Sequence, residues 1–97
     1  MIRHVAVFTW DDEMTDEMEQ QLATELTALA PKLAGLRSYH CGPDVGLAEG
    51  NFDFAVVADF DDVDAYLAYR DNPEHRAIIG RLSGPHAKSR AALQYQI

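Results

Sequence analysis

Two segments of this 97-residue chain have the composition of β-strands that carry apolar side chains on both faces. Residues 2–10 (IRHVAVFTW) and 52–60 (FDFAVVADF) are rich in β-branched and aromatic residues. In both segments apolar residues occupy even and odd positions alike, as the adjacent Val56 and Val57 illustrate. Successive side chains of a strand point to opposite faces, so a sheet built from these strands must be covered on both faces.

The segment after the first strand predicts an amphipathic helix. Thr15 or Asp16 is suited to cap its start, and Glu19 stands in capping-box position relative to Asp16. Pro31 is expected to end or kink the helix, and Gly35 to close it. An apolar stripe that we expect to face the core recurs every three or four positions: Met18, Leu22, Leu26, Leu29 and Leu33.

Two shorter helical segments are predicted in the second half of the chain. Asp62 is suited to cap a helix over residues 63–69. Asn72 and Pro73 have the pattern of a cap followed by proline at the first helical position. We expect this last segment to continue toward Leu82, where a Ser-Gly-Pro sequence follows and stops it.

Two further strands complete the pattern. Residues 36–41 (LRSYHC) and 89–97 (SRAALQYQI) alternate as strands, and the glycine-rich segment 42–51 has the composition of a loop. The order βαββαβ predicts a single α+β domain over residues 1–97, with a ferredoxin-like fold and a four-stranded antiparallel sheet. We expect the open sheet face to meet a second copy in a homodimer, which closes a dimeric α/β barrel.

The charge of the chain argues against two classes of partner. Sixteen acidic residues against eight basic ones give a net charge of -8, and such a surface repels phosphate groups. Neither nucleic acid nor a membrane is therefore an expected partner. The sequence shows no signal segment and no membrane-spanning stretch, and the lone Cys41 cannot form an internal disulfide. These features predict a cytoplasmic location.

Four histidines are candidates for chemistry: His4, His40, His75 and His86. None stands at a paired ligand spacing such as HxH or HxxxH, and there is no cysteine pair to complete a metal site. No haem or flavin motif is present either. We therefore expect neither a metal site nor a cofactor.

His75 has the most informative local context. With Asn72 as the cap and Pro73 at the first helical position, it occupies the third position of a helix. Exposed amides and the helix dipole disfavour a charged imidazolium there, which would leave His75 neutral and basic, whereas Glu74 acts in the opposite sense. Tyr69, six residues earlier, is within reach of the same pocket.

Several short motifs together carry a resemblance to a known family. They are the N-terminal Ile-Arg-His-Val-Ala-Val-Phe, the Gly-Leu-Arg-Ser-Tyr at 35–39, and Tyr69 followed by Asn-Pro-Glu-His at 72–75. In their order and spacing the chain resembles the stress-responsive dimeric α/β-barrel (Dabb) family. The resemblance implies a ferredoxin-like protomer, a homodimer with a shared barrel, and a pocket between the helices and the sheet of each protomer.

The resemblance also implies site residues. One plant member of the family is a polyketide cyclase that closes a ring by intramolecular aldol condensation without cofactor or metal. By similarity, His75 falls on its catalytic histidine, Tyr69 on the assisting tyrosine and His4 on a pocket histidine, while Phe54 replaces a further pocket histidine. We expect the ligand to be a small carbonyl compound or polyketide, and its pocket to be lined by Phe8, Phe54, Tyr66 and Ile79.

Three functions remain open from the sequence. The first is a cofactor-independent cyclase or lyase that acts on an enolisable carbonyl compound through His75 and Tyr69. The second is a non-catalytic stress-response or ligand-binding protein, in which these side chains are structural. The third is a monooxygenase of the wider dimeric α/β-barrel superfamily that uses buried aromatic side chains such as Trp10.

Overall fold

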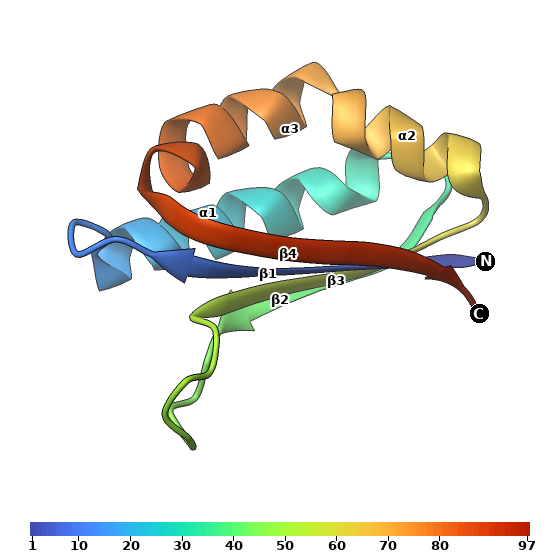
Figure 1. Ribbon diagram of the computed structural model, residues 1–97. Helices are drawn as coiled ribbons and strands as arrows, with labels where there is room; N and C mark the ends of the chain where they lie inside the picture. The colour runs from blue at the N-terminus through green and yellow to red at the C-terminus, as the bar shows by residue number, and fades with distance from the viewer.

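The computed structural model describes residues 1–97 and forms a four-stranded antiparallel sheet with all helices on one face (Figure 1). The strands run in the order β2-β3-β1-β4. The elements are β1 (Ile2–Trp10), α1 (Asp16–Leu29), η1 (Ala30–Lys32), β2 (Leu36–Pro43), β3 (Phe54–Phe60), α2 (Val63–Asp71), α3 (Pro73–Ile78), η2 (Ile79–Ser83), η3 (Gly84–His86) and β4 (Ala87–Gln96). The predicted ferredoxin-like α+β fold is thereby confirmed.

The two faces of the sheet differ in what covers them. On the central strand β1, His4 and Ala6 are buried under the helices, whereas Val5 and Val7 lie on the opposite, open face. On β3, Val56 is 4% exposed beneath the helices and Val57 is half-buried on the open face. The main core cluster lies between sheet and helices: Ala6, Trp10, Leu22, Leu26, Leu29, Phe54, Val56, Ile78 and Leu82.

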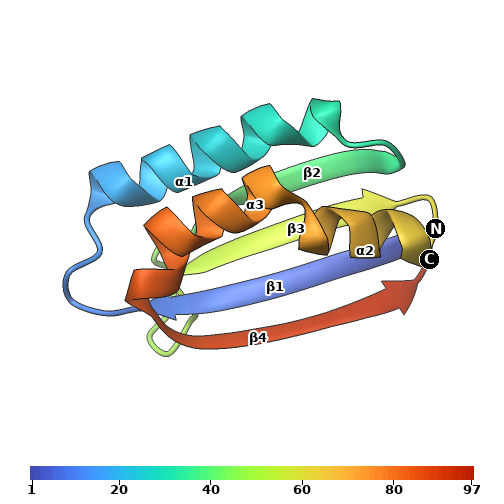
Figure 2. The ribbon, with the colours of Figure 1, turned by 90° about the horizontal axis from the view of Figure 1, so that it is seen from above.

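Strand β4 runs along one edge of the sheet without a helix above it (Figure 2). All ten of its residues are exposed in the protomer. It pairs with β1 in an antiparallel register that places Gln94 opposite His4 and Arg90 opposite Phe8. Side chains of β4 therefore reach the inner face of the sheet from its uncovered edge.

Helix α1 differs in two details from the sequence-based expectation. Thr15 is the cap, since its hydroxyl accepts a hydrogen bond from the backbone N–H of Met18, so the capping-box role predicted for Glu19 is wrong. Glu19 instead accepts a hydrogen bond of 2.8 Å from the indole N–H of Trp10. The helix ends at Leu29 and continues as a 3₁₀ turn, because Pro31 has no N–H with which to extend the helical hydrogen bonds.

The predicted strand boundaries also shift. The third strand begins at Phe54 rather than at residue 52, because Phe52 is exposed and the Asp53 carboxylate accepts a hydrogen bond from the backbone N–H of Trp10. Strand β2 extends to Pro43, and β4 starts two residues earlier than expected, at Ala87. The connection between β2 and β3 projects beyond the sheet on the side away from the helices (Figure 1). No helix of the structure has the length and apolar character that crossing a membrane requires.

Candidate functional site

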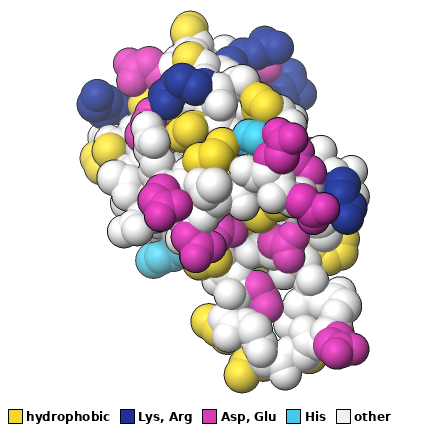
Figure 3. Space-filling view, turned by 90° about the vertical axis from the view of Figure 1, so that its left-hand side faces the viewer, with side chains coloured by type: hydrophobic (Ala, Val, Ile, Leu, Met, Phe, Trp, Pro, Cys, Tyr) yellow, Lys and Arg dark blue, Asp and Glu magenta, His cyan; other side chains and the backbone are white.

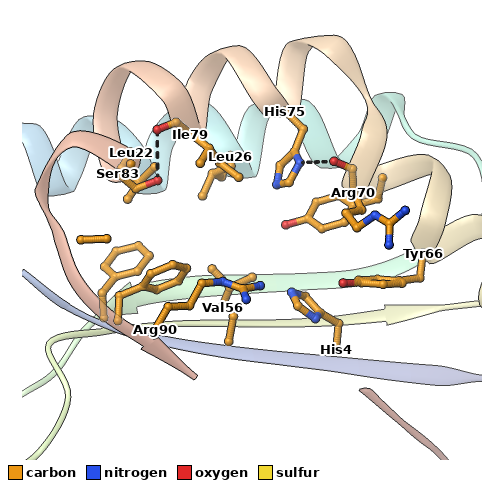
Figure 4. A pocket seen from close by; sticks show the side chains of 16 residues that line it. His4, Leu22, Leu26, Val56, Tyr66, Arg70, His75, Ile79, Ser83 and Arg90 are labelled. Atoms are coloured by element: carbon orange, nitrogen blue, oxygen red, sulfur yellow. Dashed lines mark hydrogen bonds between the residues drawn. The ribbon is translucent and has the colours of Figure 1, made fainter. Parts of the chain in front are cut away.

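A cavity of about 160 Å³ lies between the helices and the inner face of the sheet (Figure 4). Sixteen residues line it, drawn from β1, α1, β3, α2, α3, the turns η2 and η3, and β4. Ten of these residues are hydrophobic, so the lining is mostly apolar and a few polar groups orient any bound ligand. Of the candidates named from the sequence, the structure brings seven together in this cavity: His4, Phe8, Phe54, Tyr66, Tyr69, His75 and Ile79.

The start of helix α3 positions His75. The side-chain oxygen of Asn72 accepts hydrogen bonds from the backbone N–H groups of Glu74, at 2.9 Å, and His75, at 3.1 Å. The His75 side chain is 6% exposed and points from the helix layer into the cavity (Figure 4). Its Nδ1 lies 3.4 Å from the carbonyl oxygen of Arg70. A carbonyl only accepts, so Nδ1 carries the proton and Nε2 of the neutral ring keeps its lone pair.

The environment of His75 favours the neutral ring. Burial lowers the pKa of His75 below its usual value, and the positive charges of Arg76 and Arg90 act in the same direction, against the hydrogen bond to Arg70. The sequence predicted this neutrality from the helix N-terminus, whereas the main cause in the structure is burial. His75 is therefore an uncharged base with a free lone pair.

His4 is the opposite tautomer. Its ring is 3% exposed on β1, and its Nδ1 lies 2.9 Å from the side-chain nitrogen of Gln94 on β4. An amide nitrogen only donates, so Nδ1 of His4 accepts and its proton resides on Nε2. Burial, with smaller effects of Arg90 and His75, lowers the pKa of His4 to about 4. His4 thus offers a neutral N–H donor to the same cavity in which His75 offers a lone pair.

Tyr69 adds a hydroxyl donor beside His75. Its ring centroid lies 4.1 Å from that of His75, and its hydroxyl oxygen lies 3.1 Å from that of Tyr39 on β2. Burial is the main factor that raises the pKa of Tyr69 to about 12, so the phenol keeps its proton at neutral pH. Tyr39 was not predicted from the sequence as a site residue, although it lies on the helix-facing side of β2 opposite Ala58.

Two residues of β4 that act at the site were likewise not predicted from the sequence. Gln94 fixes the tautomer of His4, and Arg90 lines the cavity with its guanidinium carbon 5.9 Å from the ring centroid of Phe8. The only available signal was the alternation of β4, which gives both side chains the same face of the strand. Their positions beside His4 and Phe8 follow from the register between β4 and β1.

The other candidates from the sequence lie outside the cavity. His40 is exposed on β2, and His86 contacts the Asp11 carboxylate through Nδ1 at 3.1 Å. Trp10 stacks on Phe8, with ring centroids 5.5 Å apart, and packs into the core rather than lining the cavity. No three side chains of His, Cys, Asp or Glu lie together in an arrangement that would hold a metal ion.

Comparison with known proteins identifies a matching family, a similar sequence and similar solved structures. Residues 2–97 match the family described as Stress responsive A/B Barrel Domain (Dabb). An uncharacterised protein of Streptomyces coelicolor is 30% identical over 81 residues, which cover 81% of this chain and 84% of that protein. The crystal structure of a dimeric ferredoxin-like protein of unknown function from Thermobifida fusca superposes with a TM-score of 0.91 at 43% identity, over 99% of this chain and 90% of that one.

A more distant structure shares the fold alone. It is the hydroxynitrile lyase from Passiflora edulis, with a TM-score of 0.82 at 17% identity, over 99% of this chain and 92% of that one. The match to the family covers all the strands and all the helices that build the cavity. It agrees with the resemblance found in the sequence motifs. The chain therefore belongs to the stress-responsive A/B barrel (Dabb) family.

Proposed function

We propose that this protein is a cofactor-independent acid–base catalyst that acts on a small enolisable carbonyl compound, as a cyclase or lyase of the intramolecular aldol type. The observation that carries the proposal is the pair of opposite neutral tautomers in one apolar cavity. The Nε2 atom of His75 is a lone-pair base, and the Nε2–H of His4 and the hydroxyl of Tyr69 are donors. An enolisation requires both kinds of group.

The proposed reaction moves one proton out and back. His75 Nε2 removes a proton from the carbon next to a carbonyl, and the C–H electron pair forms the enolate. Tyr69 or His4 donates a hydrogen bond to the enolate oxygen. The enolate carbon then attacks a second carbonyl of the same molecule, and the protonated His75 returns its proton to the new alkoxide. Acid–base help of this kind accelerates a reaction by about 10²–10⁴-fold. The reverse sequence cleaves the carbon–carbon bond, as a lyase does.

The dimensions of the cavity limit the ligand. A volume of about 160 Å³ is close to that of an apolar protein cavity that holds one benzene molecule. The enclosed part therefore accommodates about one ring of a ligand, and any longer chain would extend through the opening. One protein of the same fold is a hydroxynitrile lyase, which supports the proposal that this fold can carry out lyase reactions. It says nothing about the substrate of this chain.

We also propose that the protein works as a homodimer in which a second copy covers the open sheet face. Val5, Val7 and Val57 on that face, and the exposed Leu93 and Tyr95 of β4, form an apolar surface that a lone protomer would leave to water. The Thermobifida fusca relative is described as dimeric, which supports this arrangement. The single free Cys41 suits a reducing compartment and supports the proposed cytoplasmic location.

A non-catalytic ligand-binding role is the second candidate, because the same contacts also have structural value. Tyr69 is hydrogen-bonded to Tyr39 and stacks near His75, and Asn72 caps the helix that carries His75. These contacts would hold the turn between α2 and α3 together in a protein that only binds a ligand. No comparable observation favours a monooxygenase, because the Trp10 indole is engaged by Phe8 and Glu19.

Deuterium exchange separates the two candidates. We would measure replacement of the α-protons of methyl 3-oxobutanoate in D₂O by NMR, with and without protein. We expect an acceleration that His75→Ala abolishes, that Tyr69→Phe lowers, and that His86→Gln, a histidine outside the cavity, leaves unchanged. Circular dichroism would verify the fold of each variant. Exchange that persists in folded His75→Ala would refute the catalytic role. So would an inactive wild type for which His75→Ala only lowers the melting temperature.

A further inference from the structure

The charge of the cavity lining is opposite to that of the chain. The protein has sixteen acidic residues and a net charge of -8, and acidic side chains gather over the end of the molecule seen in Figure 3. Yet none of the sixteen residues that line the cavity is Asp or Glu, whereas two, Arg70 and Arg90, are cationic. The cavity is therefore a positive site on an acidic protein.

Arg90 is the cation of this site that has no counter-ion. Arg70 places two nitrogens against the Asp71 carboxylate, at 3.0 and 3.2 Å. Three further arginines outside the cavity, namely Arg3, Arg37 and Arg81, likewise each pair through two nitrogens with one carboxylate. Arg90 forms neither an ion pair nor a side-chain hydrogen bond. Its guanidinium makes a cation–π contact with the Phe8 ring, with the guanidinium carbon 5.9 Å from the ring centroid. Its guanidinium donors are thus free to bind a ligand.

The position of Arg90 directs this charge at the two histidines. Figure 4 shows its side chain extending along the sheet side of the cavity toward His4. Its charge lowers the pKa of both His4 and His75, so it is felt at both rings. Strand β4 has no helix above it (Figure 2). Arg90 is exposed on this strand, so a ligand group bound to it can retain contact with water.

We propose that the cavity takes a small oxo acid and that Arg90 binds its carboxylate while the carbonyl lies between His4 and His75. The planar fork of a guanidinium matches a carboxylate in a bidentate geometry. A phosphate dianion would leave a second charge uncompensated, because Arg70 is already engaged by Asp71. The size of the cavity limits the acid to about one ring or its open-chain equivalent. The enolisable carbonyl in this assignment rests on the proposed function, whereas carboxylate binding does not.

The test compares two ligands of the same shape and different charge, benzoate and benzamide. Binding to the wild-type protein would be followed by NMR titration of the imidazole C–H signals. We expect benzoate to bind at least about tenfold more tightly, the lower end of what a hydrogen bond to a charged group contributes. In Arg90→Gln this preference should disappear with benzamide binding unchanged, and Arg90→Lys, which keeps the charge but loses the fork, should be intermediate.

Lys88→Gln is the matched control. Lys88 lies on the same strand outside the cavity lining, and its removal changes the net charge by the same amount. The benzoate preference should survive it. Equal affinities for benzoate and benzamide in the wild type, no binding of either, or a benzoate preference that persists in Arg90→Gln would each overturn the proposal. A benzoate preference without deuterium exchange would leave carboxylate binding intact and remove the catalytic function. Deuterium exchange of the neutral ester without a benzoate preference would leave the catalytic function intact and refute carboxylate binding.

Discussion

We expect His4 to make the protein less stable as the pH falls from 7 to 4.5. The ring is 3% exposed, and the pKa of His4 is lowered to about 4, first by burial and then by electrostatic interactions with Arg90 and with the His75 ring. In the unfolded chain the pKa returns to about 6.5. Between these two values the unfolded state binds a proton that the folded state does not. The contribution of the neutral His4 ring to the free energy of unfolding is therefore fully present above about pH 6.5 and is lost as the pH falls toward 4.

The size of the effect follows from the two pKa values. The difference between about 6.5 and about 4 corresponds to roughly 3 kcal/mol when it is fully expressed, because one pKa unit is worth about 1.4 kcal/mol. About 2 kcal/mol of this is lost between pH 7 and pH 4.5. The pKa of His75 is shifted in the same direction, so it adds to the loss in the wild type.

Urea unfolding at the two pH values measures this loss. The single tryptophan, Trp10, lies in the core and reports unfolding by fluorescence. His4→Gln cannot titrate, so its loss between pH 7 and 4.5 should be about 2 kcal/mol smaller than that of the wild type at equal protein concentration. Carboxylates titrate in both proteins and cancel in the comparison. His40→Gln, which removes an exposed imidazole, serves as the control. Equal losses in wild type and His4→Gln would refute the assignment of His4 as a buried neutral ring.

Four further substitutions test the fold and the assembly. Val56→Asp places a charge in the core and should unfold the protein in circular dichroism, whereas Val57→Asp on the open face should leave a folded protomer that sediments as a monomer. Gly35→Ala should cost at least about 1–2 kcal/mol in thermal unfolding, because Gly35 has a φ of +81° and an added Cβ would lie 2.6 Å from that of Ala65. Asn72→Ala should lower the free energy of unfolding by about 1 kcal/mol in urea titrations, because two backbone N–H groups lose their cap.

The sequence predicted those parts of the fold that depend on local pattern. The period-two alternation in the first and third strands correctly placed Val56 and Val57 on opposite faces. The Asn-Pro signal correctly placed His75 at the third position of a helix capped by Asn72. Errors arose where a nearby contact outweighed local preference. Glu19, for example, bonds to Trp10 instead of capping its own helix.

The polar partners of the site were not predictable in the same way. Gln94 and His4 are ninety positions apart in the sequence, and only the pairing of β4 with β1 brings them together. A shift of one residue in that register would move Gln94 and Arg90 to the other face of the sheet. The tautomer of His4 and the charge of the cavity depend on this register, which no local periodicity of the chain encodes.

Strand β4 serves two surfaces with alternate residues. Arg90 lines the cavity and Gln94 contacts His4 on the same face, whereas Leu93 and Tyr95 face the side that we assign to the second copy. In an isolated protomer this edge strand is held by hydrogen bonds on one side only, which makes it prone to fray. Self-association would then order the residues that orient the ligand and His4. The proposed acid–base activity per protomer would then depend on protein concentration, and dilution would abolish it well before the helices and central strands unfold.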